Sequence, residues 1–295
     1  MFDLMKYKYI FIGISAVLTL AAFFSMAFFG FKLGVDLSGG TLWQLSFEKS
    51  VTAAELESYL KDYLKMEQPS VVSDASNSNY LIRTKEISEA DHQTYFSAIK
   101  NDFGNIEELR FESIGPAIGK ELRDKAIIAF LAVLFGISAY VAFAFRKVSF
   151  PVNSWKYGFS TLICLFHDAV IPAGFFAALG YFKGIELDTN FIVAILVIIG
   201  FSVHDTIVVF DRIRENLTLS KDRNDLGKII NISINQTFAR SINTSLTLFL
   251  VLIALYFFGA PSLAYFTLTI LVGIIIGTYS SIFVASPLLT FFHRE

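Results

Sequence analysis

Two His-Asp dipeptides lie inside stretches of the sequence that are otherwise apolar. His167-Asp168 stands near the middle of residues 158–182, and His204-Asp205 stands near the end of residues 189–210. A carboxylate at the centre of a bilayer costs about 3 kcal/mol on insertion scales, and such residues usually serve an ion or proton path. The two dipeptides are therefore the first candidates for chemistry in this chain.

Three kinds of chemistry fit these residue types. A metal site would use imidazole and carboxylate, but neighbours on a helix point about 100° apart, so one dipeptide does not easily supply two ligands. A pair of aspartates sharing one proton needs both carboxylates at one depth, and these differ by about a turn and a half. A proton path could use Asp205 in a titrating ion pair with Arg240, at the entry to the apolar residues 243–259.

Each of these residues also has a purely structural interpretation. The histidines could be hydrogen-bonded core residues, and Arg240 could be an interfacial anchor whose head group reaches the membrane surface. Thr206, Thr244 and the other polar residues of 243–247 are typical of hydrogen bonding between helices. Gly273 and Gly277 form a GxxxG motif on an apolar stretch, which predicts close helix packing.

Six apolar stretches would carry these residues across a membrane. The chain is 54% hydrophobic with a mean hydropathy of +0.58, and about 20 apolar residues span a bilayer as a helix. The stretches are 9–29, 125–145, 158–182, 189–210, 243–259 and 263–291. The first is too long for a usual signal peptide, so we expect a retained helix.

Charge predicts the orientation of these helices. With the N-terminus inside, the lysines and arginines of the short loops fall almost entirely on the cytoplasmic side, and Lys183 is the exception. Both termini would then be cytoplasmic. The basic residues need no nucleic acid to explain them, and the single cysteine, Cys164, allows no intramolecular disulfide.

A domain of different pattern interrupts the apolar stretches. We divide the chain into 1–30 with the first helix, an extracytoplasmic domain at 31–122, and 123–295 with helices two to six and a cytoplasmic loop at about 211–242. Strands are predicted at 41–47, 71–74, 80–87 and 106–114, and helices begin after the capping residues Thr52 and Ser88. This β-α-β-β-α-β order predicts a ferredoxin-like α+β fold, and 34–41 a tight turn at its entry.

The sequence resembles the SecF family of the RND superfamily along nearly its whole length. The resemblance rests on GVDLSGGT (34–41), ESIGPAIGKELRDKA (112–126), LFHD (165–168), HDTIVVFDRIREN (204–216) and NQTFARSINTSLTLFLVLIALYFFG (235–259). Two features depart from the family pattern. Leu37-Ser38 stands where Phe-Thr is usual, and His204 stands where an asparagine usually precedes the aspartate.

The resemblance implies a function as well as an architecture. It implies an RND-type half bundle of six helices in the bacterial inner membrane, completed by SecD and associated with the SecYEG channel, with SecA and the preprotein as indirect partners. Such proteins use the proton-motive force to assist late steps of protein export. The family's membrane aspartates match Asp205 and Asp168, and its arginine matches Arg240, so we expect these with His167 and His204 to form the proton relay.

Other functions remain open at this point. They are an RND-type exporter of lipids or small molecules, an assembly scaffold with inert carboxylates, and an intramembrane hydrolase. We expect no enzymatic activity, no metal and no cofactor other than the proton gradient, because the sequence carries no nucleophile elbow, phosphate loop or metal-ligand spacing.

Overall fold

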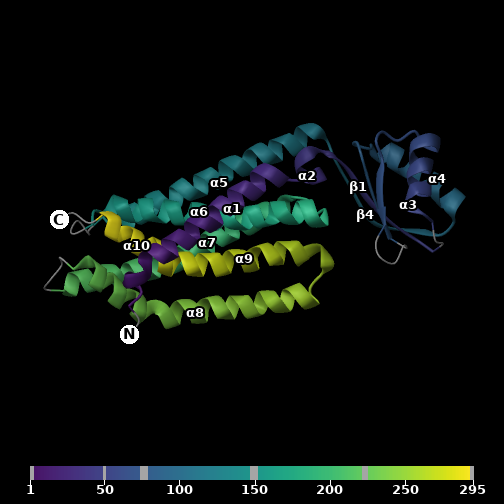
Figure 1. Ribbon diagram of the computed structural model, residues 1–295. Helices are drawn as coiled ribbons and strands as arrows, with labels where there is room; N and C mark the ends of the chain where they lie inside the picture. Colours follow the sequence, from purple (N-terminus) through teal and green to yellow (C-terminus); the bar gives the residue numbers. More distant parts are fainter. Residues whose placement is uncertain (1–2, 49–50, 74–78, 147–151, 221–224, 293–295) are drawn as a thin grey trace. The chain divides into compact units, whose positions relative to one another are not determined.

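The computed structural model describes residues 3–48, 51–73, 79–146, 152–220 and 225–292 (Figure 1). The chain forms two compact units. One unit, the sheet domain, is Leu33–Ala126, and the helical unit takes the residues before and after it. The predicted domain, 31–122, therefore lies within a few residues of the observed one. The difference at its end arises because the first turns of a long helix belong to the sheet domain.

Within the described residues, six helices are long and apolar enough to cross a membrane, as the sequence predicted. They are α1 (Lys8–Phe29), α5 (Pro116–Ala144), α6 (Ser154–Lys183), α7 (Thr189–Leu219), α8 (Leu226–Phe258) and α9 (Ala264–Ser280). The last continues through a π-helical turn, Ser281–Ala285, into the short segments Ser286–Leu288 and Leu289–Phe292. The chain is thus a multi-pass helical membrane protein.

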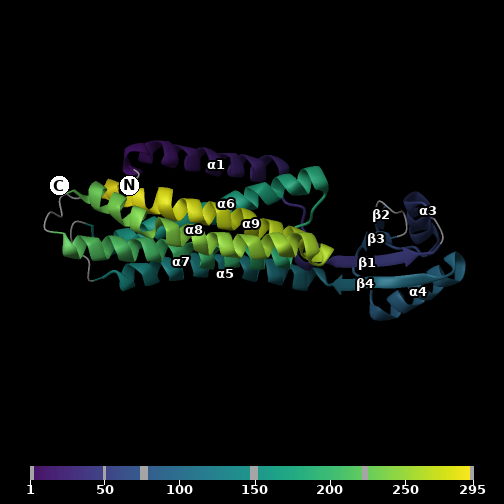
Figure 2. The same ribbon diagram turned by 90° about the horizontal axis from the view of Figure 1, so that it is seen from below.

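Helices α6, α7 and α9 form the interior of the helical unit. Each has many buried positions, whereas α1 buries only Ser15 and Ala22. Figures 1 and 2 show α1 along the outside of the bundle, beside α6. Because apolar side chains on α1, α5 and α8 are widely exposed, these outer helices present the surface that lipid or a partner chain would cover.

The predicted cytoplasmic loop at 211–242 is wrong, because helices occupy most of it. α7 continues to Leu219 and α8 already begins at Leu226. Charged and amide side chains hold the extended ends together. Arg212 donates to Gln236 at 2.6 Å, and Asn216 donates to Ser233 and Gln236 at 2.8 Å. The charged residues read as a loop are thus the polar surface of a helical hairpin.

The sheet domain has the predicted β-α-β-β-α-β order. Its strands are β1 (Gly40–Phe47), β2 (Ser70–Ser73), β3 (Asn79–Thr84) and β4 (Ile106–Ile114), in the antiparallel order β2-β3-β1-β4. Helix α3 (Ala53–Ser58), extended by a π-helical turn at Tyr59–Tyr63, connects β1 to β2, and α4 (Glu89–Phe103) connects β3 to β4. The predicted β2–β3 turn lies largely at 74–78, outside the described residues.

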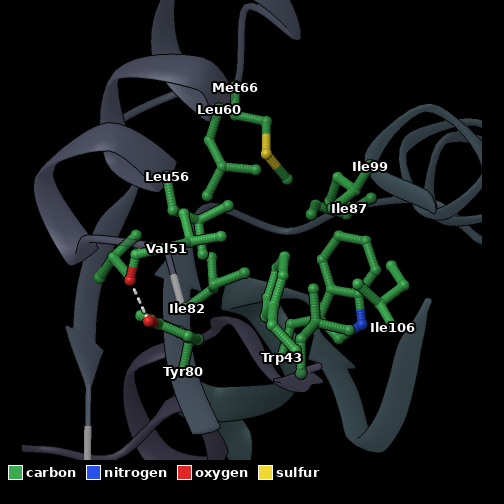
Figure 3. Close-up of a cluster of buried hydrophobic side chains, with 13 residues drawn as sticks. Trp43, Val51, Leu56, Leu60, Met66, Tyr80, Ile82, Ile87, Ile99 and Ile106 are labelled. Atoms are coloured by element: carbon green, nitrogen blue, oxygen red, sulfur yellow. Dashed lines mark hydrogen bonds between the residues drawn. The ribbon is translucent and has the colours of Figure 1, made fainter. Parts of the chain in front are cut away.

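The core of the sheet domain lies between the sheet and its two helices (Figure 3). Trp43, Tyr80 and Ile82 come from the strands, and Leu56, Leu60 and Ile99 come from the helices. The two polar groups of this core are bonded: the Trp43 indole donates to Glu108 at 2.7 Å, and the Tyr80 hydroxyl donates to the Val51 carbonyl. A satisfied apolar core of this kind supports an independently folding unit.

Both predicted helix caps of this domain are present. The Thr52 hydroxyl accepts the amide of Glu55 at 3.2 Å, and the Ser88 hydroxyl accepts the amide of Asp91 at 3.2 Å. Each bond satisfies one of the amides that a helix leaves unpaired at its first turn. The sequence therefore located these helix starts correctly.

A glycine joint links the beginning and the end of the sheet domain. The short helix α2 (Val35–Ser38) leads into Gly39, whose φ of +77° suits glycine. A Cβ at Gly39 would lie 2.5 Å from the Cα of Pro116, and a Cβ at Gly119 would lie 2.6 Å from the Gly39 nitrogen. The predicted tight turn is thus packed backbone to backbone against the start of α5.

Candidate functional site: two buried carboxylates in the helical unit

Asp168 is completely buried and fully hydrogen-bonded. Its Oδ1 pairs with the adjacent His167 Nδ1 at 2.7 Å. Its Oδ2 accepts the hydroxyl of Ser202 on α7 and the hydroxyl of Ser280 on α9, the latter at 2.6 Å. Since the bonds come from three helices, Asp168 ties α6, α7 and α9 together at the middle of the bundle.

Asp205 lies in a different environment. Its Oδ1 accepts the hydroxyl of Ser241 on α8 at 2.6 Å, and the residue is 6% exposed. Its Oδ2 is buried and has no hydrogen-bond partner among the described residues. A buried carboxylate oxygen without a donor is unfavourable when the group is ionised. Of the two carboxylates, Asp205 is therefore the one whose ionised form is less well stabilised by hydrogen bonds.

Two sets of bonded hydroxyls lie beside the two carboxylates, one next to Asp168 and one next to Asp205. The hydroxyls of Thr206 and Ser281 bond each other at 2.8 Å, and both reach the carbonyl of Ser202. Ser245 bonds Thr278 at 2.5 Å and the carbonyl of Ser241 at 2.9 Å. We call the two sets together the hydroxyl seam; its members are Ser202, Thr206, Ser241, Ser245, Thr278 and Ser281. One set joins α7 to the turn that follows α9, and the other joins α8 to α9.

The predicted ion pair between Asp205 and Arg240 is not formed within the described part of the chain. Arg240 is exposed, and the carboxylate bonds Ser241 instead. The reason is helical geometry: consecutive residues point about 100° apart, so Ser241 takes the direction toward Asp205. Arg240 forms no contact with the carboxylate but stays near enough for its charge to act on it. His204 is exposed for the same reason, because Asp205 takes the inward direction. Arg240 and His204 thus face outward on the side where α7 meets α8.

The other two chemistries gain no geometric support. Asp168 and Asp205 accept hydrogen bonds from different serines on different helices, which is unlike a pair sharing one proton. Over the residues that the structure describes, no three His, Cys, Asp or Glu side chains gather as a metal site would require. The expectation of no metal remains a prediction.

The residues expected to pack helices lie in three different situations. A Cβ at Gly273 would collide with the side chain of Ile198, and one at Gly277 would lie 3.1 Å from the Cβ of Ser202, so both glycines face α7. Thr206 reaches Ser281 through the hydroxyl seam. Thr244 departs from the expectation: it is exposed, and its hydroxyl donates to the Arg240 carbonyl of its own helix at 2.9 Å.

Sequence reasoning missed the serines that hold the carboxylates. Ser202, Ser241 and Ser280 donate to them, although none was singled out as a site residue. Two spacings carried a usable signal: Ser202 with Thr206, and Ser241 with Ser245, lie four residues apart and so share one helix face. A hydroxyl stripe beside a membrane aspartate is the pattern that would have identified them.

Comparison with known proteins identifies the family of this chain. The family model for the protein export membrane protein SecD/SecF, C-terminal, matches residues 94–295, and the SecD/SecF GG motif matches residues 24–51. The protein translocase subunit SecF of Thermobaculum terrenum is 42% identical, with 98% of this chain and 93% of the relative covered. The chain belongs to the SecF family. It therefore has a SecF-type role in protein export, and its partner in that system is SecD.

Further relatives support the same family. SecF of Haemophilus influenzae is 37% identical over 96% of this chain and 83% of the relative. A crystal structure of SecDF from Thermus thermophilus, titled a translocon-associated membrane protein, superposes with a TM-score of 0.81 at 32% identity. That match covers 98% of this chain and 38% of the SecDF chain. The SecF-type fold, six helices with a small sheet domain, is thus shared with a solved SecDF structure.

Proposed function

We propose that this SecF-type chain couples the proton-motive force to protein export, with Asp205 as the titrating group. The observation that supports this proposal is the half-bonded, buried carboxylate of Asp205. When ionised, it holds the Ser241 hydroxyl and leaves Oδ2 without a donor. When protonated, Oδ2 becomes a donor itself and seeks an acceptor. Taking up a proton therefore changes which groups of α7 and α8 attract each other.

The energy available is sufficient for a conformational change. One charge that crosses 100 mV of membrane potential yields about 2.3 kcal/mol. That energy shifts a two-state equilibrium by about fiftyfold. A proton that reaches Asp205 from one side and leaves to the other would deliver this energy at the contact between α7 and α8.

We further propose that SecD covers the outward face of α8. Four exposed polar residues share one side of this helix, because each lies three or four residues from two of the others: Arg240, Asn243, Thr244 and Thr247. Such residues within a membrane span normally face protein rather than lipid. A SecD helix bringing an acceptor to Arg240 would complete the relay that Asp205 begins, and it would explain why Arg240 points away from this chain's own interior.

The remaining parts of the proposal concern location and partners. We propose that the chain lies in the bacterial inner membrane with both termini in the cytoplasm and the sheet domain outside. There the complex works with SecYEG and, indirectly, with SecA and the emerging preprotein. It carries out no covalent catalysis and needs no cofactor besides the proton gradient. The charge distribution of the short loops supports this orientation.

The test is preprotein transport into inverted membrane vesicles, with and without an ionophore. Asp205→Asn keeps the shape of the side chain but holds it in one charge state. We expect the variant to co-purify with SecD normally and to lose the stimulation of transport by the gradient. Arg240→Met should do the same, because it removes the charge and keeps much of the side-chain volume.

The matched control is Asp211→Asn. Asp211 lies on the same helix, one and a half turns beyond Asp205, and pairs at the surface with Arg214; exposed pairs contribute little. We expect this variant to respond to the gradient as the wild type does. If Asp205→Asn vesicles keep the full response, the carboxylate is structural and the scaffold function is the correct one. Gradient-driven transport of a lipid or small molecule in place of a preprotein would favour the exporter.

A further inference from the structure

The imidazole of His167 has two nitrogens with different surroundings. Nδ1 pairs with Asp168 at 2.7 Å, whereas Nε2 is buried and has no hydrogen-bond partner among the described residues. The residue is 5% exposed, so water from the surface does not reach it directly. An imidazole can exchange protons at both nitrogens, and here only Nδ1 has a partner among the described residues.

A second buried polar atom near α6 lies on α1. Ser15 is 4% exposed, and its hydroxyl forms no hydrogen bond of acceptable geometry to a described residue. The only other buried residue of α1 is Ala22, two turns further on, in an apolar cluster with Val170 and Ile171 of α6. Of the two buried positions on α1, one is therefore apolar (Ala22) and the other is polar (Ser15).

The register of α1 against α6 places Ser15 at about the level of His167. Ala22 packs against Gly174, and Phe29 stacks on Tyr181 at 4.7 Å. Both contacts have the same sequence offset of 152, so the two helices run in the same direction. Residues seven apart share a helix face, so the same offset pairs Ser15 with His167, two turns before Ala22 and Gly174.

Helix α9 closes the same place from the third side. The Tyr279 hydroxyl donates to the carbonyl of Phe11 at 2.8 Å, one turn of α1 before Ser15, and lies beside the Ser15 hydroxyl. The next residue, Ser280, donates to Asp168. Ser15 and Tyr279 therefore lie side by side on α1 and α9, and both helices pack against α6, which carries His167. An internal water needs two to four polar partners of this kind.

We propose that Ser15, Tyr279 and His167 form an internal water site, and that His167 connects this site to Asp168. This inference rests on the proposed proton coupling and gives it a second branch, away from α8. A proton passes from the Asp168 carboxyl group to Nδ1 while the proton on Nε2 passes to the water. The carboxyl group loses one proton, the water gains one, and the imidazole changes tautomer without changing charge.

The water site is tested by thiol labelling of the full chain, co-expressed with SecD. In a Cys164→Ala background, Ser15→Cys is compared with Ala22→Cys, which lies on the same face of the same helix in the apolar cluster. We expect Ser15→Cys to react with a small methanethiosulfonate reagent at least about tenfold faster, because only a hydrated thiol ionises and reacts. Equal, slow reaction at both positions would overturn the site.

The relay role is tested by gradient-dependent transport. His167→Gln keeps an amide near the position of Nε2 but cannot take a proton at one end and release it at the other. We expect it to assemble with SecD and to lose most of the gradient response, and Ser15→Ala to lose part of it. A full response of His167→Gln would overturn the relay, even if Ser15→Cys is labelled.

These outcomes are distinct from failure of the proposed function. If Asp205→Asn and His167→Gln both respond normally, proton coupling through this chain is wrong, and labelling of Ser15→Cys still reports whether water is present. If only Asp205→Asn loses the response, coupling stands and the His167 branch is wrong. Should His167→Gln fail to assemble, His167→Asn provides the second variant for the same comparison.

Discussion

Asp168 and Asp205 differ in how many hydrogen bonds each accepts. Asp168 has partners on both oxygens from three helices, whereas Asp205 accepts a bond from Ser241 alone among the described residues. A hydrogen bond to an ionised group contributes about 1.5–3 kcal/mol. The single bond to Asp205 is therefore a large part of what distinguishes its charged state from its neutral state.

This contrast predicts the effect of removing one hydroxyl. Ser241→Ala takes away the one donor that the described residues offer Asp205. We therefore expect the carboxylate to favour its protonated form and the gradient response of transport to fall severalfold. Ser241→Thr keeps a hydroxyl and should restore most of the response. The measurement is transport into inverted vesicles with and without an ionophore.

The control for Ser241→Ala is Thr269→Val on α9. Thr269 is equally buried, but its hydroxyl donates to the Tyr265 carbonyl of its own helix at 2.7 Å. We expect its removal to leave the gradient response unchanged. An equal loss in both variants would mean that the effect of Ser241→Ala comes from general destabilisation of the bundle.

At the scale of the elements, the glycine joint makes the start of α5 a part of the sheet domain. Gly39 combines a positive φ with a neighbouring backbone that leaves no room for a Cβ. Because the obstructing atoms belong to the backbone of Pro116, no side-chain rotation relieves the collision. The joint therefore fixes the entry and the exit of the domain to each other.

Gly39→Ala should destabilise the sheet domain strongly. Gly39, with φ +77° and ψ +161°, lies in a backbone region that is essentially restricted to glycine. A residue with a Cβ there costs about 1–3 kcal/mol, and the collision adds to that cost. We expect faster proteolysis of the domain in membranes and a melting temperature lower by about 4–8 °C per kcal/mol. Gly136→Ala on α5, where a Cβ meets nothing within 4 Å, should have no such effect.

The sequence predicted the elements well where a local signal exists. Capping residues located both helices of the sheet domain, and apolar length located the six spans. It failed at 211–242, because charge alone does not distinguish a loop from the polar surface of helices that extend beyond the membrane. It also failed for the serines around the carboxylates. The sequence does not show whether a serine hydroxyl faces lipid, bonds its own helix or bonds another helix.

The direction of Arg240 shows a further limit of prediction. Its position at the start of a span was evident, but which of two adjacent residues faces α7 depends on the rotation of α8 in the bundle. That rotation is set by packing against α7 and α9, which involves residues far apart in the chain. A one-residue difference on a helix turns a side chain by about 100°, so the predicted ion pair was lost.

At the scale of the whole molecule, the chain consists of two units with separate cores. The core of the sheet domain is made only of residues 43–106 and their neighbours within the domain. We expect residues 33–126, expressed alone, to unfold cooperatively on heating, as judged by far-UV circular dichroism and calorimetry. A non-cooperative transition, or a disordered spectrum, would show that the domain depends on the bundle.

The chain contains two tryptophans, and one lies in each unit. Trp43 is sealed in the core of the sheet domain, whereas Trp155 is 56% exposed at the start of α6. Their fluorescence should therefore separate into a blue-shifted, iodide-resistant component and a component open to its surroundings. The Trp43 emission can be followed in intact, unlabelled protein while a proton gradient is applied. If the gradient loosens the sheet domain, this emission shifts to the red. If the domain moves as a rigid body, the emission stays unchanged.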